Sequence, residues 1–345
     1  MRESLNALLC FAVAVTLAAS LPCSAQSDHP YKYFRIGNSA DAANAAPRPG
    51  YALMGGGTDL DEAFKFLCDR AGGGDFIVLR ASGDDDYNPY IRKLCPALNS
   101  VATLIMTNRA AAEDPFSANA IRHAGAVFIA GGDQANYINF WMHSPVQDAL
   151  NEDIVRGVPL GGTSAGLAVM GEWAYTSQGD KPDDPNLTGK LAMSDPYGPR
   201  NTLVQGFLHI SQLDGIITDT HFAKRDRMGR LLTFIARLNR PDGKPLPATT
   251  PRLRGIGVQE RAAFLLEPDG TGRVVGNGDA YFIDTAGASG MPAQGAPLTF
   301  GPYDVLKVEP GHTFNLKSWT GQSTSYNLNV QNGQIKSTQA GGTVY

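Results

Sequence analysis

The chain has 345 residues, a formal net charge of −4 and 18% charged residues. That length suffices for one large α/β domain with a small appendage, and the absence of a dominant basic cluster argues against nucleic acid as a partner. No Cys/His spacing indicates a metal site, and we expect neither a metal nor another cofactor.

The N-terminal 25 residues are typical of a secretory signal peptide. Arg2 provides a positive start, residues 8–21 are almost wholly apolar, and residues 23–25 (Cys-Ser-Ala) have the small side chains of a cleavage site. The apolar run is short for a membrane-spanning helix, and no later run is longer. We therefore expect an exported protein, secreted or periplasmic, that is cleaved near Ala25 and then has no membrane contact.

Two of the four cysteines lie in this signal, which leaves Cys68 and Cys95 for the mature chain. An oxidising compartment would permit a disulfide between them, but two separate buried thiols fit the sequence equally well.

Short apolar runs and helical segments alternate after an irregular lead-in at 26–48. Strands are predicted at 51–54, 76–79, 101–106 and 126–129, a fifth leads to Ser164, and 216–218 forms a sixth; helices are predicted at 59–70, 90–94, 118–123 and 135–141, with Asp59 as a cap of the first. This pattern predicts an α/β fold with a doubly wound, mostly parallel sheet, whose active site lies beyond the carboxyl ends of the strands.

The pattern changes after residue 255. Further short strands are predicted at 255–258, 263–266, 273–275 and 281–283. We place the catalytic domain at 49–285, a linker rich in Ala, Gly and Pro at 286–301, and a β-rich C-terminal appendage at 302–345.

Residues 162–166 (Gly-Thr-Ser-Ala-Gly) are the most informative stretch of the chain. A strand that ends at small residues and continues as a helix makes a tight turn, which exposes the side chain at its apex. This is the pattern of a nucleophile elbow with Ser164 at the tip. A serine nucleophile needs a base, and His221 is the best placed of the six histidines because it directly follows the strand at 216–218.

The segment 219–230 is dense in charge. Arg227 and Arg230 are three residues apart and are expected on one helix face, with Arg225 elsewhere on the same helix. Guanidinium groups beside a serine site suit a substrate carboxylate, although a solvated helix face is the simpler interpretation. Asp219 is a candidate for the acid that orients His221.

Three separated motifs resemble the cyanophycinase family of serine peptidases, which includes aspartyl dipeptidases. They are Gly-Gly-Asp-Gln at 131–134, Gly-Gly-Thr-Ser-Ala-Gly at 161–166, and Asp-x-His-Phe-x-x-Arg-x-Arg-x-x-Arg at 219–230, with a weaker match at 255–260. The resemblance covers roughly residues 50–285. It implies a fold like that of the class I glutamine amidotransferases, with serine in place of their cysteine.

The resemblance also implies roles for individual residues. Ser164 would be the nucleophile, His221 the general base and Glu260 the acid that orients it, while backbone N–H groups of Gly132 and Ala165 would hold the oxyanion. Substrate-binding positions are implied for Gln134, Asp219, Arg225, Arg227 and Arg230.

Cyanophycinases release β-aspartyl-arginine dipeptides from cyanophycin, a poly-aspartate with arginine on each β-carboxyl. The resemblance therefore implies an exported serine-type peptidase that acts on cyanophycin or another peptide, and a possible homodimer. Thr220 stands where cyanophycinases usually have Gln, and Gln259 stands where they have an acidic residue. Both departures favour keeping an aspartyl dipeptidase acting on another acidic peptide as an alternative.

Two other classes compete with this interpretation. An α/β-hydrolase esterase would pair Ser164 with His312, but it would leave the motif at 131–134 unexplained, and no His-Gly-Gly-Gly-type oxyanion motif is present. A non-catalytic secreted binding protein could use the same fold, although the residues expected to be catalytic are all present.

Overall fold

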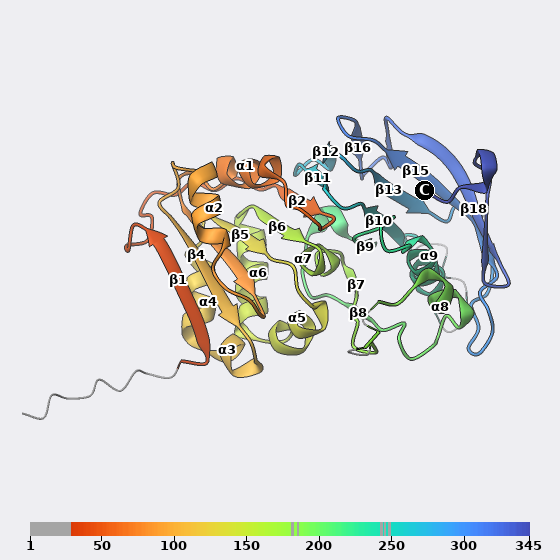
Figure 1. Cartoon of the computed structure of the whole chain (residues 1–345), viewed down its shortest axis with the longest axis horizontal. Helices are drawn as coiled ribbons and strands as arrows, with labels where there is room; N and C mark the ends of the chain where they lie inside the picture. The colour runs from red at the N-terminus through yellow and green to blue at the C-terminus, as the bar shows by residue number, and fades with distance from the viewer. Residues whose placement is uncertain (1–28, 181–182, 185, 242–243, 245, 248–249) are drawn as a thin grey trace, which may run out of the picture.

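The computed structural model describes residues 29–345 except 181–182, 185, 242–243, 245 and 248–249. The signal peptide expected at 1–25 lies outside the described residues. Within the described part, no helix is both long and apolar enough to cross a bilayer. The strands of that part form two sheets, which follow one another along the long axis of the molecule (Figure 1).

The first sheet has a parallel centre with antiparallel strands at both sides. Neighbours β4, β3, β5, β6 and β2 run parallel, whereas β1 joins β4 and β11 joins β2 in the antiparallel sense. In spatial order its ten strands are β1 (Tyr31–Gly37), β4 (Ser100–Met106), β3 (Asp75–Arg80), β5 (Ala126–Ile129), β6 (Leu160–Thr163), β2 (Tyr51–Met54), β11 (Ala262–Leu266), β12 (Thr271–Gly276), β16 (Thr313–Asn315) and β17 (Thr320–Gly321).

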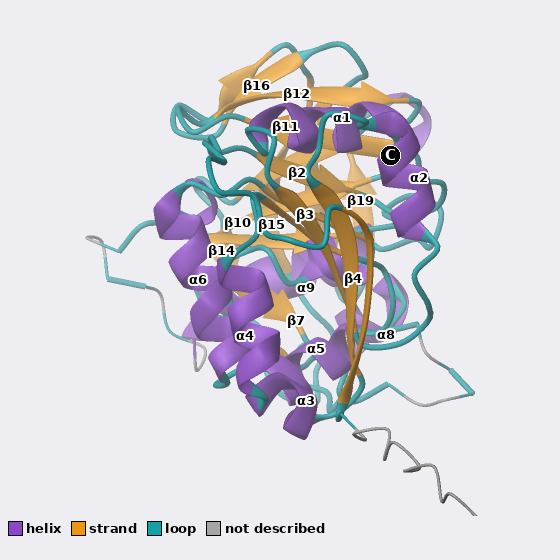
Figure 2. Ribbon diagram, turned by 90° about the vertical axis from the view of Figure 1, so that its left-hand side faces the viewer, coloured by secondary structure: helices purple, strands orange, loops and turns teal. Residues whose placement is uncertain are grey.

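Helices cover both faces of this sheet (Figure 2). Alternate residues of β2 illustrate why: Ala52 and Met54 pack in the cluster that includes α1 and α2, and Tyr51 and Leu53 pack in the cluster that includes α3 to α6. The α/β fold predicted from the alternating pattern is thus confirmed. The helices are α1 (Asp61–Arg70), α2 (Tyr87–Leu94), α3 (Arg109–Glu113), α4 (Pro115–Arg122), α5 (Gln134–Trp141), α6 (Pro145–Arg156), α7 (Ala165–Ala168), α8 (Gly189–Ser194) and α9 (Met228–Asn239).

The second sheet contains a shorter parallel part. In spatial order it runs β19 (Gln334–Ser337), β18 (Thr324–Gln331), β15 (Phe300–Val308), β13 (Ala280–Asp284), β10 (Arg254–Val258), β9 (Ile216–Asp219), β7 (Trp173–Tyr175) and β8 (Leu203–Gln205), and β14 (Ser289–Gly290) pairs with β15. Strand β9 runs parallel to both β10 and β7.

The strand at 216–218 therefore forms as predicted but belongs to the second sheet. The edge of β2 that it would extend is already occupied by β11. Strands within 302–345 continue both sheets, because β15 and β18 follow β13 and β16 follows β12. The domain boundaries drawn from the sequence stay predictions.

Two local expectations were wrong. The lead-in at 26–48 is not irregular throughout, since β1 pairs along its whole length with β4, and Tyr31 and Tyr33 pack against the core. Asp59 does not cap α1, whose N-cap is Leu60 without a side-chain hydrogen bond. The Asp59 carboxylate instead accepts hydrogen bonds from Thr163 Oγ1 at 2.7 Å and Tyr87 Oη at 2.5 Å.

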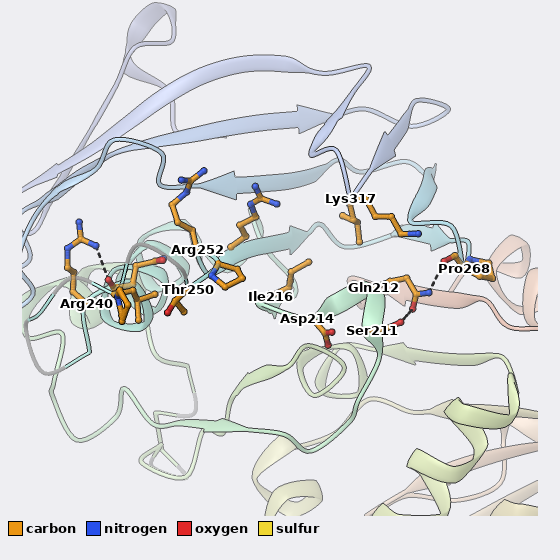
Figure 3. Close-up of a pocket in the computed structure, with 15 residues that line it drawn as sticks. Ser211, Gln212, Asp214, Ile216, Arg240, Thr250, Arg252, Pro268 and Lys317 are labelled. Atoms are coloured by element: carbon orange, nitrogen blue, oxygen red, sulfur yellow. Dashed lines mark hydrogen bonds between the residues drawn. The ribbon is translucent and has the colours of Figure 1, made fainter.

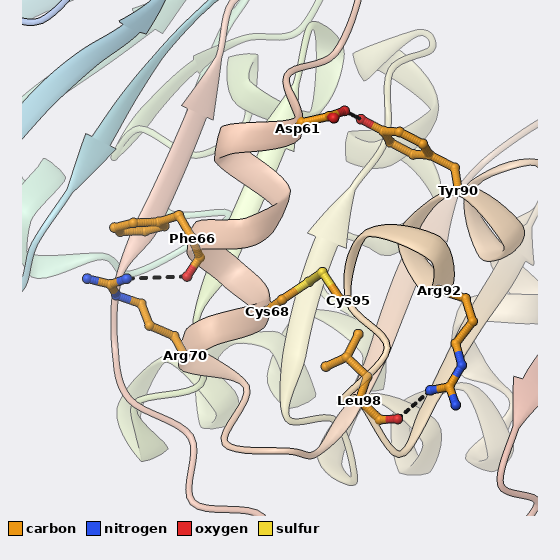
Figure 4. Close-up of a disulfide and its surroundings, with 8 residues drawn as sticks. All are labelled: Asp61, Phe66, Cys68, Arg70, Tyr90, Arg92, Cys95 and Leu98. Atoms are coloured by element: carbon orange, nitrogen blue, oxygen red, sulfur yellow. Dashed lines mark hydrogen bonds between the residues drawn. A yellow bond between two sulfur atoms is a disulfide. The ribbon is translucent and has the colours of Figure 1, made fainter.

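A disulfide joins Cys68 in α1 to Cys95 at the end of α2, across 27 residues of sequence (Figure 4). The sequence left the pairing of these two cysteines open. The bond connects two helices that cover the same face of the first sheet, and such a crosslink stabilises a fold mainly by restricting the unfolded chain.

Candidate active site

Ser164 stands at a sharp turn between β6 and α7. Its φ of 52° and ψ of −116° are rare for a non-glycine residue. The flanking glycines are required by close approach: a Cβ on Gly162 would lie 2.6 Å from the backbone of Gly166, and one on Gly166 would lie 2.0 Å from the carbonyl oxygen of Ile129. The turn is the nucleophile-elbow geometry that the sequence predicted.

His221 and Glu260 reach Ser164 from the second sheet. His221 follows β9 and Glu260 follows β10. The Ser164 Oγ to His221 Nε2 distance is 2.7 Å, and the His221 Nδ1 to Glu260 Oε1 distance is also 2.7 Å. Because an ionised Glu260 can only accept, His221 donates its Nδ1–H, which leaves Nε2 to accept the Ser164 proton.

The protonation states of His221 and Glu260 suit a role of His221 as a general base. Burial lowers the pKa of His221, an effect that the Glu260 hydrogen bond opposes and the charges of Arg225 and Arg227 reinforce. The hydrogen bond from His221 lowers the pKa of Glu260, which is only partly buried. Near neutral pH the imidazole is therefore uncharged and the carboxylate ionised.

Asp219, the other candidate acid, has a different partner. Its two carboxylate oxygens accept hydrogen bonds from Arg230 at 2.7 and 2.5 Å, and both side chains are almost completely buried. Burial opposes the charge of Arg230, but the bond to Asp219 outweighs it and the pKa of Arg230 is raised. The structure thus brings Asp219 and Arg230 together beneath the site rather than placing Asp219 on His221.

A cleft of about 410 Å³ opens beside Ser164. The predicted residues that line it come from the loop after β5 and the start of α5, from the elbow, and from the segment before α9 and the first turn of α9. They are Gly132, Gln134, Ser164, Ala165, Arg225, Arg227 and Arg230.

The three arginines differ in their surroundings. Helix α9 begins at Met228, so Arg225 and Arg227 lie in the preceding loop and not on the helix predicted to carry them. Arg225 is exposed, whereas Arg227 is 6% exposed and donates to Thr220 and Asn186. Burial, together with the charge of Arg230, lowers the pKa of Arg227 to about 9, an effect that the Asp219 carboxylate 3.7 Å away opposes only in part.

Several residues of the site have no counterpart in the sequence analysis. Gly56 packs against the reacting groups, because a Cβ there would lie 2.6 Å from the His221 ring and 3.1 Å from Ser164 Cβ. The sequence pointed to Gly56 only through the run of three glycines at 55–57, directly after a predicted strand. Four other residues of the cleft lie in a part of the chain where no motif was recognised: Tyr175, Ser177, Asp180 and Asn186.

A larger cavity of about 880 Å³ lies elsewhere, around Ser211, Asp214 and Lys317 (Figure 3). Its two neighbouring arginines, Arg252 and Arg254, both pair with Asp284. Neither Ser164 nor His221 lines this cavity, so the larger of the two cavities is not the one that contains the reactive serine. His312, the base of the esterase alternative, lies in the turn between β15 and β16, and the Ser164 hydroxyl contacts His221 instead.

Comparisons with known proteins show that the chain is similar to peptidases. The model of peptidase family S51 matches residues 53–195, which include Ser164 and end before His221. The cyanophycinase of Synechococcus elongatus is 28% identical over 243 residues, a match that spans 67% of this chain and 66% of that protein, a little under two thirds of its length. The cyanophycinase of Geminocystis herdmanii is 29% identical over 220 residues, covering 62% of this chain and 71% of the relative.

Among solved structures, a peptidase from an acI-B1 Actinobacterium superposes with a TM-score of 0.51 at 16% identity. The superposition covers 78% of this chain and 97% of that one. At this identity the likeness supports the fold alone.

Proposed function

We propose that this chain is a serine-type peptidase of family S51, and that it hydrolyses cyanophycin to β-aspartyl-arginine dipeptides. Two curated relatives named cyanophycinase support this substrate. The observation that carries the proposal is the continuous chain of hydrogen bonds from Ser164 through His221 to Glu260.

In the proposed mechanism, His221 Nε2 takes the hydroxyl proton as Ser164 Oγ attacks the amide carbonyl carbon. Backbone N–H groups of Gly132 and Ala165, which line the cleft beside Ser164, stabilise the oxyanion. His221 then gives the proton to the leaving amine, and the acyl-enzyme remains. Water, deprotonated by His221, attacks the ester; a carboxylate product leaves and the proton returns to Ser164. Glu260 stabilises the imidazolium in both steps.

Substrate recognition is assigned to the basic side of the cleft. Arg227 is buried and shares its nearby carboxylate, Asp219, with Arg230, so a substrate carboxylate would add the negative charge that two cations beside one anion favour. Arg225 is exposed at the same cleft and can reach a more distant carboxylate. Arg230 and Asp219 act beneath these groups as a paired support, and Gln134 offers an uncharged contact at the start of α5.

A second candidate is an aspartyl dipeptidase that acts on another acidic peptide. Thr220, one of the two departures from the cyanophycinase pattern, lines the cleft and accepts from Arg227. The side chain of Gln259, the other departure, is bonded to Tyr281 Oη and the amide of Asp279. Thr220 is therefore the departure that would alter substrate choice.

Export and assembly are further parts of the proposal. The disulfide between Cys68 and Cys95 fits an oxidising compartment, and the expected signal peptide would direct the chain there. The N-terminal sequence of protein produced with its leader in a bacterial host tests export and should begin near Gln26. Its mass in solution tests the homodimer.

The test of function is mass spectrometry of the products from insoluble cyanophycin, with Ser164→Ala in parallel. Ser211→Ala is a control, because Ser211 lines the separate cavity and its hydroxyl bonds to Gln212. Release of β-aspartyl-arginine by the wild type and the Ser211→Ala variant, but not by Ser164→Ala, is the expected result. Absence of the dipeptide with all three proteins, followed by cleavage of aspartyl dipeptides, would favour the second candidate.

A further inference from the structure

The segment between β9 and α9, residues 220–227, carries His221, Arg225 and Arg227 without regular secondary structure. His221 has a φ of 46° and Asp226 a φ of 47°, both in the left-handed region that non-glycine residues rarely adopt. The first end is fixed by the His221 N–H, which donates to the Gly55 carbonyl at 2.7 Å. A strained segment that positions reactive groups also needs a contact that fixes its other end.

That contact comes from Tyr345, 119 residues away in sequence from Asp226. Helix α9 lacks a cap of its own, since Arg227 at the N-cap makes no side-chain hydrogen bond to the first turn. The N–H of Met228 instead donates to Tyr345 Oη at 2.8 Å. The same hydroxyl donates to Asp226 Oδ1 at 3.0 Å, which holds the carboxylate beside the helix N-terminus.

The Tyr345 ring completes the attachment. It packs edge-on against Phe222 with ring centroids 5.8 Å apart, and against Tyr281 with centroids 6.0 Å apart. Phe222 is fully buried and is the residue directly after His221. Burial raises the pKa of Tyr345, so its hydroxyl remains a donor at any pH at which the enzyme would work. One side chain thus contacts both the base-bearing part and the arginine-bearing part of the segment.

We propose that Tyr345 is a positioning residue of the active site, which caps α9 from outside and fixes the segment that carries His221, Arg225 and Arg227. The proposal rests on the function given above insofar as these three residues act on substrate. The Tyr345 hydroxyl lies at the end of the segment that carries Arg225 and Arg227, so loss of this hydroxyl should weaken substrate binding more than it slows the chemical step. The Tyr345 ring lies beside Phe222, so loss of the whole side chain should also slow the chemical step.

The test compares Tyr345→Phe with Tyr303→Phe. Tyr303 is buried and its hydroxyl also bonds to the backbone of α9, donating to the Leu232 carbonyl 2.9 Å away, and that bond does not involve the segment 220–227. Each change removes one hydrogen bond to the backbone of α9, and Tyr345→Phe also removes the bond to Asp226. We expect Tyr345→Phe to raise KM about three- to tenfold with kcat within about twofold, and Tyr303→Phe to leave both within about twofold.

Hydrogen exchange of peptides covering 220–230 gives a readout that needs no substrate. Tyr345→Phe should speed exchange of the Met228 amide, and Tyr303→Phe should not. Equal KM values and equal exchange in the two variants would overturn the proposal. If the wild type releases nothing from cyanophycin, the proposed substrate fails, and the exchange difference alone then supports or overturns the role of Tyr345.

Discussion

The two sheets contribute to the site in different ways. The first sheet supplies Ser164 through contacts that are local in sequence, because glycines two residues to either side permit the turn. The second sheet supplies His221 and Glu260, which lie 57 residues from Ser164 and 39 residues from His221, respectively. A nucleophile can therefore be recognised from five residues, whereas the base and its acid depend on how two sheets meet.

The glycine run at 55–57 is where they meet. It follows β2 of the first sheet, yet the Gly55 carbonyl accepts from the N–H of His221 at 2.7 Å and the Gly56 carbonyl accepts from the N–H of Arg261 at 2.9 Å. Close packing at this junction holds the imidazole against the serine. Substitutions in the first sheet, in the second sheet and at this junction should therefore have different effects.

The largest effect is expected from the base. His221→Ala should lower kcat/KM by about 10⁴- to 10⁶-fold, because the serine then lacks a proton acceptor. His312→Ala is the matched control, and its kcat/KM should stay within about twofold of the wild-type value. The rate of β-aspartyl-arginine release from cyanophycin decides this, and a large loss in the His312 variant would revive the esterase arrangement.

The junction should be nearly as sensitive. Gly56→Ala places a Cβ 2.6 Å from the His221 ring at a φ of +92°, so the imidazole must move, and we expect about a 100-fold loss in kcat/KM. Gly73→Ala has a similar φ of +76° but nothing within 4 Å of the new Cβ. It tests the backbone cost alone, about 1 kcal/mol of stability, with activity unchanged. Equal kinetics in the two variants would refute the packing argument.

The two buried arginines should separate binding from stability. Arg227→Gln should raise KM about tenfold or more, because it removes the cation assigned to the substrate carboxylate. Arg230→Gln leaves the buried Asp219 without its partner and should cost about 3–5 kcal/mol in unfolding free energy. KM and urea denaturation of both variants test this, and the opposite pattern would exchange the two roles.

The smallest effect on activity is expected at the disulfide, which joins two helices that cover the first sheet. Replacing Cys68 and Cys95 by alanine should cost about 2–4 kcal/mol of stability and leave kcat/KM within about twofold at 25 °C. Thermal denaturation with and without reductant tests the first part. A parallel loss of activity in the folded variant would show that the α1–α2 region affects the site.

The sequence predicts the first sheet better than the second. The parallel strands of the first sheet and the elbow at Ser164 can be predicted because apolar runs and glycines carry local signals. The place of β9 could not be predicted, because it depends on β11 occupying the edge of β2, a pairing between residues more than 200 positions apart.

The charged residues show a similar limit. Spacing placed Arg225, Arg227 and Arg230 on one helix, but α9 begins only at Met228, so two of the three are in the loop. Nothing local in the sequence distinguishes Arg230, which makes two hydrogen bonds to Asp219, from Arg227, which approaches the same carboxylate only to 3.7 Å. The roles of Tyr175 and Asp180 in the cleft wall had no sequence signal that we could recognise.

The most direct measurement is the rate at which a fluorophosphonate labels the protein as a function of pH, with the modified peptide identified by mass spectrometry. The adduct should lie on Ser164. Since burial lowers the pKa of His221, the neutral base persists below the usual histidine range, and labelling should be lost only as pH falls through a midpoint below 6.5. Labelling at another residue, or a midpoint at or above 6.5, would contradict an uncharged, buried His221 acting on Ser164.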